Sequence, residues 1–60
     1  MPDKEAFARY LSVQKSGVTN MLDSRIVCDL ADITKDEHLY IIKHYSELVD
    51  KYGITMDDVD

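Results

Sequence analysis

The segment from Thr34 to Gly53 places the strongest constraint on the fold of this chain. Thr34 and Glu37 form a capping-box pattern, in which a threonine and a glutamate three residues later satisfy the free amides at a helix start. Apolar residues then recur at steps of three and four, the period of a helix with one buried face. Gly53 can take the left-handed conformation that ends a helix. The pattern predicts one long helix over residues 35–52. Its main apolar stripe consists of Ile41, Ile42, Tyr45, Leu48, Val49 and Tyr52.

A first helix is predicted over residues 3–16. Pro2 provides a rigid start, and Asp3 puts a negative charge at the helix N-terminus, where it is favoured. Phe7 and its helically spaced neighbours form an apolar stripe, and Gly17 is placed to end the helix.

A shorter second helix is predicted over residues 22–32. Several residues that favour helix N-caps crowd into the segment before it, so the pattern does not single out one cap. These candidate caps are Thr19, Asn20, Asp23 and Ser24. Its expected apolar face consists of Ile26, Val27, Leu30 and Ala31.

A chain of 60 residues can build only a small core, which disulfides, metals or self-association commonly support. Cys28 is the single cysteine, so it cannot form an intrachain disulfide. His38 and His44 do not share a helix face, so we expect no metal site and no cofactor. We therefore expect an all-α, three-helix homodimer. If the helix over residues 35–52 pairs with its symmetry mate, its stripe forms the dimer interface. Residues 1–54 would form one domain, and residues 55–60 a flexible acidic tail.

The charge balance limits the classes of partner. Seven basic and twelve acidic residues give a net charge of −5. Direct binding to nucleic acid is disfavoured, because it depends on neutralising phosphates with lysine and arginine. We find neither a signal peptide nor an apolar run of membrane-spanning length, and we expect a soluble, cytoplasmic protein.

Four residues of the long predicted helix are candidates for binding a protein partner. Leu39 and Tyr40 point away from the main stripe, and Tyr40 aligns with His44 and Glu47. A helix that is apolar on a second side either touches a partner or packs under another element. Both interpretations of Leu39 and Tyr40, an interface and packing under the second helix, stay open at this point.

Catalysis is not expected. His44 lies near Tyr40 and Glu47 in the predicted helix, but no nucleophile, convergent carboxylate pair or phosphate-binding glycine loop accompanies it. We therefore expect that the protein is not an enzyme.

Residues 16–23 read Ser-Gly-Val-Thr-Asn-Met-Leu-Asp. This segment resembles a family of short helical proteins of phages and prophages that carry a Ser-Gly-x-Thr-Asn-Met-x-Asp signature and have no assigned activity. Leu22 stands where that family has phenylalanine. The resemblance implies a phage origin. Read physically, the signature residues Gly17, Thr19, Asn20, Met21 and Asp23 make a turn and a helix start, which favours a structural loop over a recognition loop.

These observations together predict a small accessory protein that binds and modulates a host or phage protein. One version is an inhibitor that occupies the basic surface of a defence or nucleic-acid enzyme, since the chain is acidic. A structural subunit of a larger assembly is the main alternative. A small helix-turn-helix-like regulator with the second helix as its reading helix is a further alternative that the charge disfavours.

Overall fold

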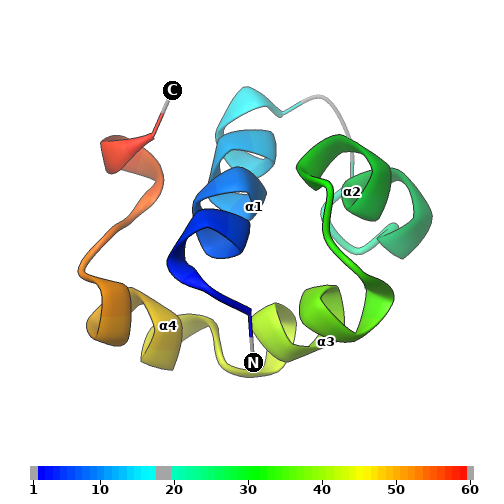
Figure 1. Ribbon diagram of the computed structural model, residues 1–60. Helices are drawn as coiled ribbons and strands as arrows, with labels where there is room; N and C mark the ends of the chain where they lie inside the picture. The colour runs from blue at the N-terminus through cyan, green and yellow to red at the C-terminus, as the bar shows by residue number, and fades with distance from the viewer. Residues whose placement is uncertain (1, 18–19, 60) are drawn as a thin grey trace.

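The computed structural model describes residues 2–17 and 20–59, whose regular elements are all helices, with no strand among them (Figure 1). This confirms the all-helical class. The elements are α1 (Lys4–Ser16), α2 (Ser24–Ala31), α3 (Lys35–Lys43), α4 (Tyr45–Tyr52) and a 3-10 turn, η1 (Met56–Asp58). None of the described helices combines the length and the apolar character that crossing a membrane requires.

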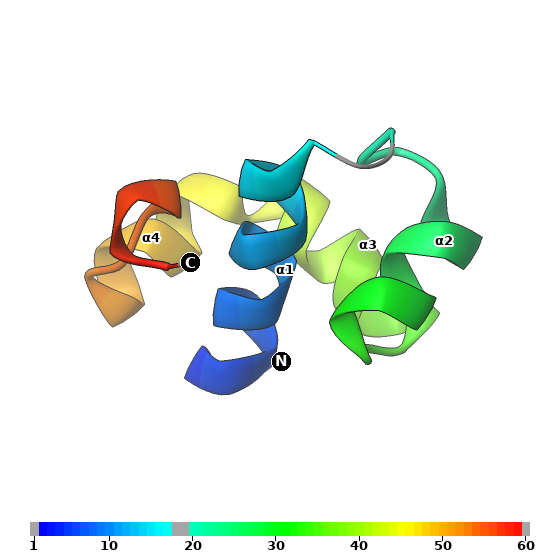
Figure 2. The ribbon, with the colours of Figure 1, turned by 90° about the horizontal axis from the view of Figure 1, so that it is seen from above.

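The central element is α1, with α2 on one side and α4 and η1 on the other (Figure 2). The Asp3 side chain caps its start by accepting a hydrogen bond of 2.8 Å from the Ala6 amide. Gly17 ends it with a φ of 65°, a conformation that residues with a side chain rarely adopt. The first predicted helix and its glycine stop are therefore confirmed.

The prediction of one long helix over 35–52 is wrong. The Thr34–Glu37 capping box is present and starts α3, but the helix ends at Lys43 and α4 begins at Tyr45. His44 lies between them with φ −122° and ψ 29°. The described residues thus form four short α-helices rather than three.

The break at His44 bends the segment around α1. α3 packs against α2, whereas α4 turns its tyrosines toward α1. The Tyr45 ring meets the Phe7 ring edge-on at 5.8 Å, and its hydroxyl donates to Gln14 Oε1 at 3.1 Å. Because no proline or glycine stands at the break, we attribute it to these contacts with α1 rather than to local sequence.

The core lies where α1 meets the other helices. Its largest fully buried apolar side chains are Phe7, Leu11, Val27, Ile41 and Leu48. Ile41 and Leu48 belong to the stripe that we expected to pair between two copies. Since both are used inside one chain, that stripe does not offer the exposed face that the expected dimer requires.

Residues 55–59, part of the segment expected to be a flexible tail, lie beside α1. Thr55 and Asp58 form a capping box around η1, and the Lys15 ammonium donates to the Val59 carbonyl at 2.7 Å. Val59 packs against the core cluster. On the other end of the fold, the Tyr52 hydroxyl donates to the Pro2 carbonyl at 2.7 Å.

Candidate protein-binding surface

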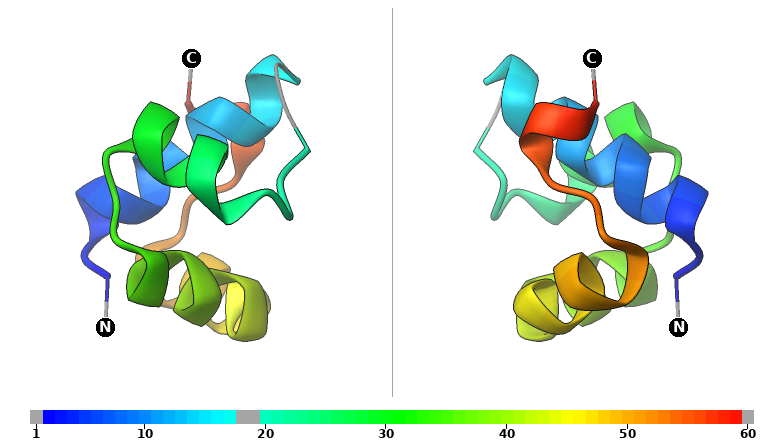
Figure 3. Two further views of the ribbon diagram at one scale, coloured as in Figure 1. Left: turned by 90° about the vertical axis from the view of Figure 1, so that its right-hand side faces the viewer. Right: turned by 90° about the vertical axis from the view of Figure 1, so that its left-hand side faces the viewer.

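α2 and α3 are joined by the three residues 32–34, which is the connection of a helix-turn-helix unit. The left view of Figure 3 shows α2 above α3 with this short turn between them. In such units the second helix presents its outer face to a ligand. The outer face of α3 is therefore the first place to look for a binding surface.

The turn is fixed by the backbone of Asp32, the one described residue other than glycine with a positive φ, at 54°. The next amide, that of Ile33, donates to the Cys28 carbonyl at 3.2 Å, as in a Schellman stop. Arg9 of α1 adds a cation at this end of α2, where the helix dipole favours it. Its Nε donates to the Ala31 carbonyl at 2.7 Å and its Nη2 to the Asp32 carbonyl at 3.3 Å.

His38 holds α3 against α2 and the loop before it. The side chain is fully buried, with Nδ1 at 2.8 Å from Ser24 Oγ and Nε2 at 2.9 Å from the Met21 carbonyl. A carbonyl only accepts, so we assign the proton to Nε2, and the Ser24 hydroxyl then donates to Nδ1. The sequence suggested no such role for His38.

The outer face of α3 exposes apolar side chains. Leu39 is 41% exposed and Ile42 is 38% exposed. With Lys35 they lie at positions i, i+4 and i+7, which share one side of a helix. Lys35 and Lys43 are exposed beside them, as is Asp36. We call Lys35, Leu39, Ile42 and Lys43 the α3 face.

The structure brings three of the four predicted partner-binding residues into one row. The Tyr40 ring stacks on His44 at 4.3 Å and 31°, and His44 Nδ1 lies 3.3 Å from Glu47 Oε1. This last approach lacks hydrogen-bond geometry, since Nδ1 has no hydrogen-bond partner. Tyr40 is half-buried and packs against the core, whereas Leu39 lies on the neighbouring α3 face.

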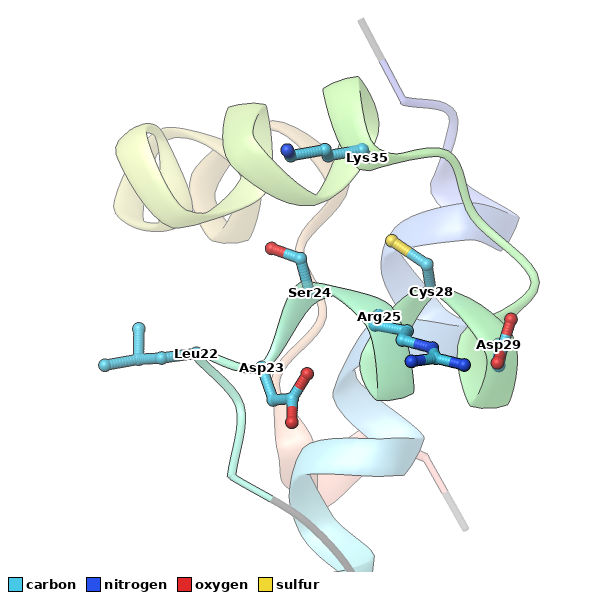
Figure 4. Close-up of a pocket in the computed structure, with 7 residues that line it drawn as sticks. All are labelled: Leu22, Asp23, Ser24, Arg25, Cys28, Asp29 and Lys35. Atoms are coloured by element: carbon cyan, nitrogen blue, oxygen red, sulfur yellow. The ribbon is translucent and has the colours of Figure 1, made fainter.

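A surface hollow of about 530 Å³ lies between α2 and the start of α3 (Figure 4). Arg25, Cys28 and Lys35 are among its lining residues. Burial raises the pKa of the Cys28 thiol, and the carboxylates of Asp29 and Glu37 raise it further, with Lys35 acting in the opposite direction. The hollow therefore holds a thiol that favours its neutral, less nucleophilic form.

The expected apolar face of the second helix divides into two in the structure. Val27 and Ala31 are fully buried, whereas Ile26 is 42% exposed and Leu30 is 52% exposed. Leu22, which precedes α2, is 73% exposed. The sequence carried a signal for this outer stripe, because residues 22, 26 and 30 are spaced by four.

The signature residues of the loop have structural roles. Asn20 Oδ1 accepts from the Leu22 amide at 2.9 Å, and Asp23 caps α2 through the Ile26 amide at 3.5 Å. The Met21 carbonyl accepts from His38, and Gly17 ends α1. Thr19, the remaining signature residue, lies outside the described residues. These contacts give the four described signature residues structural partners.

Within residues 2–17 and 20–59, no three His, Cys, Asp or Glu side chains gather in a group that could hold a metal ion. No protein-family model, curated protein or solved structure matches the chain.

Proposed function

We propose that this chain is a non-enzymatic accessory protein that binds another protein through the α3 face. The observation that supports this proposal is the exposure of Leu39 and Ile42 on the second helix of the helix-turn-helix unit. Large apolar side chains exposed together on a small protein commonly mark a protein interface. His38, Arg9 and the Schellman stop hold α3 in place, so the face is pre-organised for a partner.

The charge on this unit favours a protein over DNA. Reading helices meet base edges with the residues of their N-terminal turns, close to phosphate. In α3 these turns carry the acidic residues Asp36 and Glu37 beside Lys35, and the whole chain carries a net charge of −5. Carboxylates near phosphate oppose binding, whereas an apolar centre such as Leu39 suits a protein surface.

The geometry of α2 and α3 nevertheless supports a second candidate, a DNA-binding regulator. Its support is the three-residue turn and the packing of α3 across α2. In this arrangement α3, rather than the second helix we first considered, is the reading helix.

The wider role follows from the resemblance of residues 16–23 to phage-encoded proteins. We propose that the partner is a host or phage protein in the bacterial cytoplasm and that binding modulates it. Inhibition of a defence or nucleic-acid enzyme through a basic surface is the concrete version, and a structural subunit is the alternative. The protein also forms a homodimer in this proposal, by a face treated below.

The test compares two substitutions of matched chemistry. Leu39→Asp places a charge in the α3 face, whereas Met56→Asp places it on η1 at a residue 37% exposed. A partner captured by tagged protein from infected-cell lysate is purified and titrated against both variants by calorimetry. We expect Leu39→Asp to weaken binding by at least about tenfold and Met56→Asp to leave it unchanged. Tyr40 is a poorer test residue because it also packs against the core.

Equal affinity of the two variants for the partner would show that the α3 face is not the binding site. Binding to random duplex DNA that weakens with salt and with Lys35→Ala would instead favour the regulator. Co-purification with virion proteins at fixed stoichiometry would favour the structural subunit.

A further inference from the structure

The outer side of α2 carries an apolar stripe that is separate from the α3 face. Leu22, Ile26 and Leu30 form it, and they are 73%, 42% and 52% exposed. Ile26 and Leu30 lie one turn apart on the same side of α2, and Leu22 stands in the turn before the helix start at Ser24. α2 lies at the edge of the molecule, opposite α4 and η1 (Figure 2). The exposed fractions of Ile26 and Leu30 show that this side of the helix is open to solvent. We call these three residues the α2 stripe.

Two opposite charges border the α2 stripe on the same flank. Arg25 and Asp29 both project from α2 (Figure 4) and are exposed. At positions i and i+4 they follow the same row, next to Ile26. Neither side chain forms an ion pair or side-chain hydrogen bond with any of the described residues. Both charges are therefore free to pair with another molecule.

We propose that the α2 stripe binds the same stripe of a second copy of this chain, with the two α2 helices antiparallel. A two-fold axis passing near Ile26 places Ile26 against its own copy and puts Leu30 beside the end of the second α2 that Leu22 precedes. The same axis keeps the Arg25 and Asp29 side chains of both copies on one side of the contact between the two α2 helices. Arg25 then faces Asp29 of the second copy to within about two residues' rise along the helix, roughly 3 Å.

The charges of Arg25 and Asp29 favour a second copy of this chain as the partner of the α2 stripe. In a two-fold interface the same surface of both copies must be complementary to itself. Arg25 of one copy meets Asp29 of the other only when the two α2 helices run antiparallel. A parallel two-fold pairing would instead place the two Arg25–Asp29 rows on opposite sides of the interface, where the charges of the two copies cannot pair. The pairing creates two equivalent ion pairs around three apolar contacts, and it also supports a core limited by a length of 60 residues.

The dimer is expected to be weak. Three apolar side chains from each copy cover less than the roughly 800 Å² per partner of a standard interface. We therefore expect a dimer dissociation constant in the high micromolar to millimolar range. The α2 stripe and the α3 face share no residue. A substitution that abolishes self-association can therefore leave partner binding intact, and the two proposals can be tested independently.

The test is a charge exchange read by sedimentation equilibrium, between ~20 µM and ~2 mM protein, the range expected for a small interface. Arg25→Asp and Asp29→Arg each convert both cross-pairs from attraction to repulsion. We expect either single change to weaken dimerisation by about tenfold. The double variant restores opposite charges in reversed order and is expected to regain the original dimerisation. Circular dichroism checks that each variant is folded.

Two further variants keep the test decisive. Lys4→Asp makes the same net charge change as Arg25→Asp on α1, and we expect it to leave dimerisation unchanged. Leu22→Ser alters a side chain that lies outside every helix and is expected to weaken dimerisation without loss of folding. A wild-type protein that is monomeric at the highest concentration would overturn the proposal. So would a dimer that persists in Arg25→Asp, Asp29→Arg and Leu22→Ser.

Discussion

His38 of α3 and Ser24 of α2 are joined by a hydrogen bond of 2.8 Å between Nδ1 and Oγ. Ser24 is the first residue of α2, and His38 is fully buried. Together with the bond from Nε2 to the Met21 carbonyl, this contact ties the loop, α2 and α3 at one point. The histidine therefore determines how α3 sits on α2.

We expect His38→Ala to lower the free energy of unfolding by about 2–4 kcal/mol. The change leaves a cavity and removes the partners of a serine hydroxyl and a buried carbonyl. Ser24→Ala removes one of these bonds and should cost about 1 kcal/mol. Urea unfolding followed by circular dichroism measures both. His44→Ala is the matched control, because the His44 side chain is 37% exposed; an equal loss there would contradict the role of His38.

Asp32→Gly should stabilise the protein by about 0.5–1 kcal/mol, which corresponds to a rise of several degrees in Tm for a domain of this size. Asp32 has a φ of 54° and lies where the negative end of α2 disfavours a carboxylate. Glycine relieves both costs, and Arg9 still binds the backbone carbonyl. Asp29→Gly, inside α2, should instead destabilise by about 1 kcal/mol. If both variants melt below the wild type, the turn does not carry the strain.

Cys28 should react more slowly with a thiol reagent in the folded protein than in the urea-unfolded chain. Burial, then Asp29 and Glu37, raise its pKa above the usual value, so less thiolate is present at a given pH. The folded rate should approach the unfolded rate as pH rises through the raised pKa. Alkylation rates over a pH series measure this. Equal rates in the folded and unfolded chains at neutral pH would show that the fold does not protect the thiol.

Stability should fall at alkaline pH because of Tyr10. Burial raises the pKa of Tyr10, and Tyr45 raises it further, so the folded state favours the neutral phenol. A group with a raised pKa contributes full stability below its ordinary value of about 10. That contribution is lost as pH rises through the higher value of the folded state. Tm measured at several alkaline pH values should therefore fall less in Tyr10→Phe than in the wild type; identical slopes would exclude Tyr10 as the cause.

Local chemistry predicted the helix ends well. Asp3, the Thr34–Glu37 capping box and the two glycine stops act through residues close in sequence, so their effects can be read from the chain. The end of α3 at Lys43 could not be read in this way. It depends on contacts of Tyr45 with Phe7 and Gln14, which are distant in sequence.

The candidate surfaces were predicted only in part. Leu39 was recognised as an outward apolar residue, and it lies exposed on the α3 face. The second-helix pattern showed four apolar residues but not that Val27 and Ala31 would face inward while Ile26 and Leu30 face outward. That division depends on where α1 and α3 lie. His38 was missed because a buried histidine needs partners that only the fold brings to it.

The shortness of α3 has a practical consequence for anyone seeking to imitate or block this protein. A helix of nine residues does not hold its shape alone in water, because isolated helices below about 12–15 residues are marginal. A linear peptide copied from residues 35–43 should thus be largely unstructured and a poor competitor for the partner. A chemically cross-linked peptide, or the intact domain, would be the useful reagent.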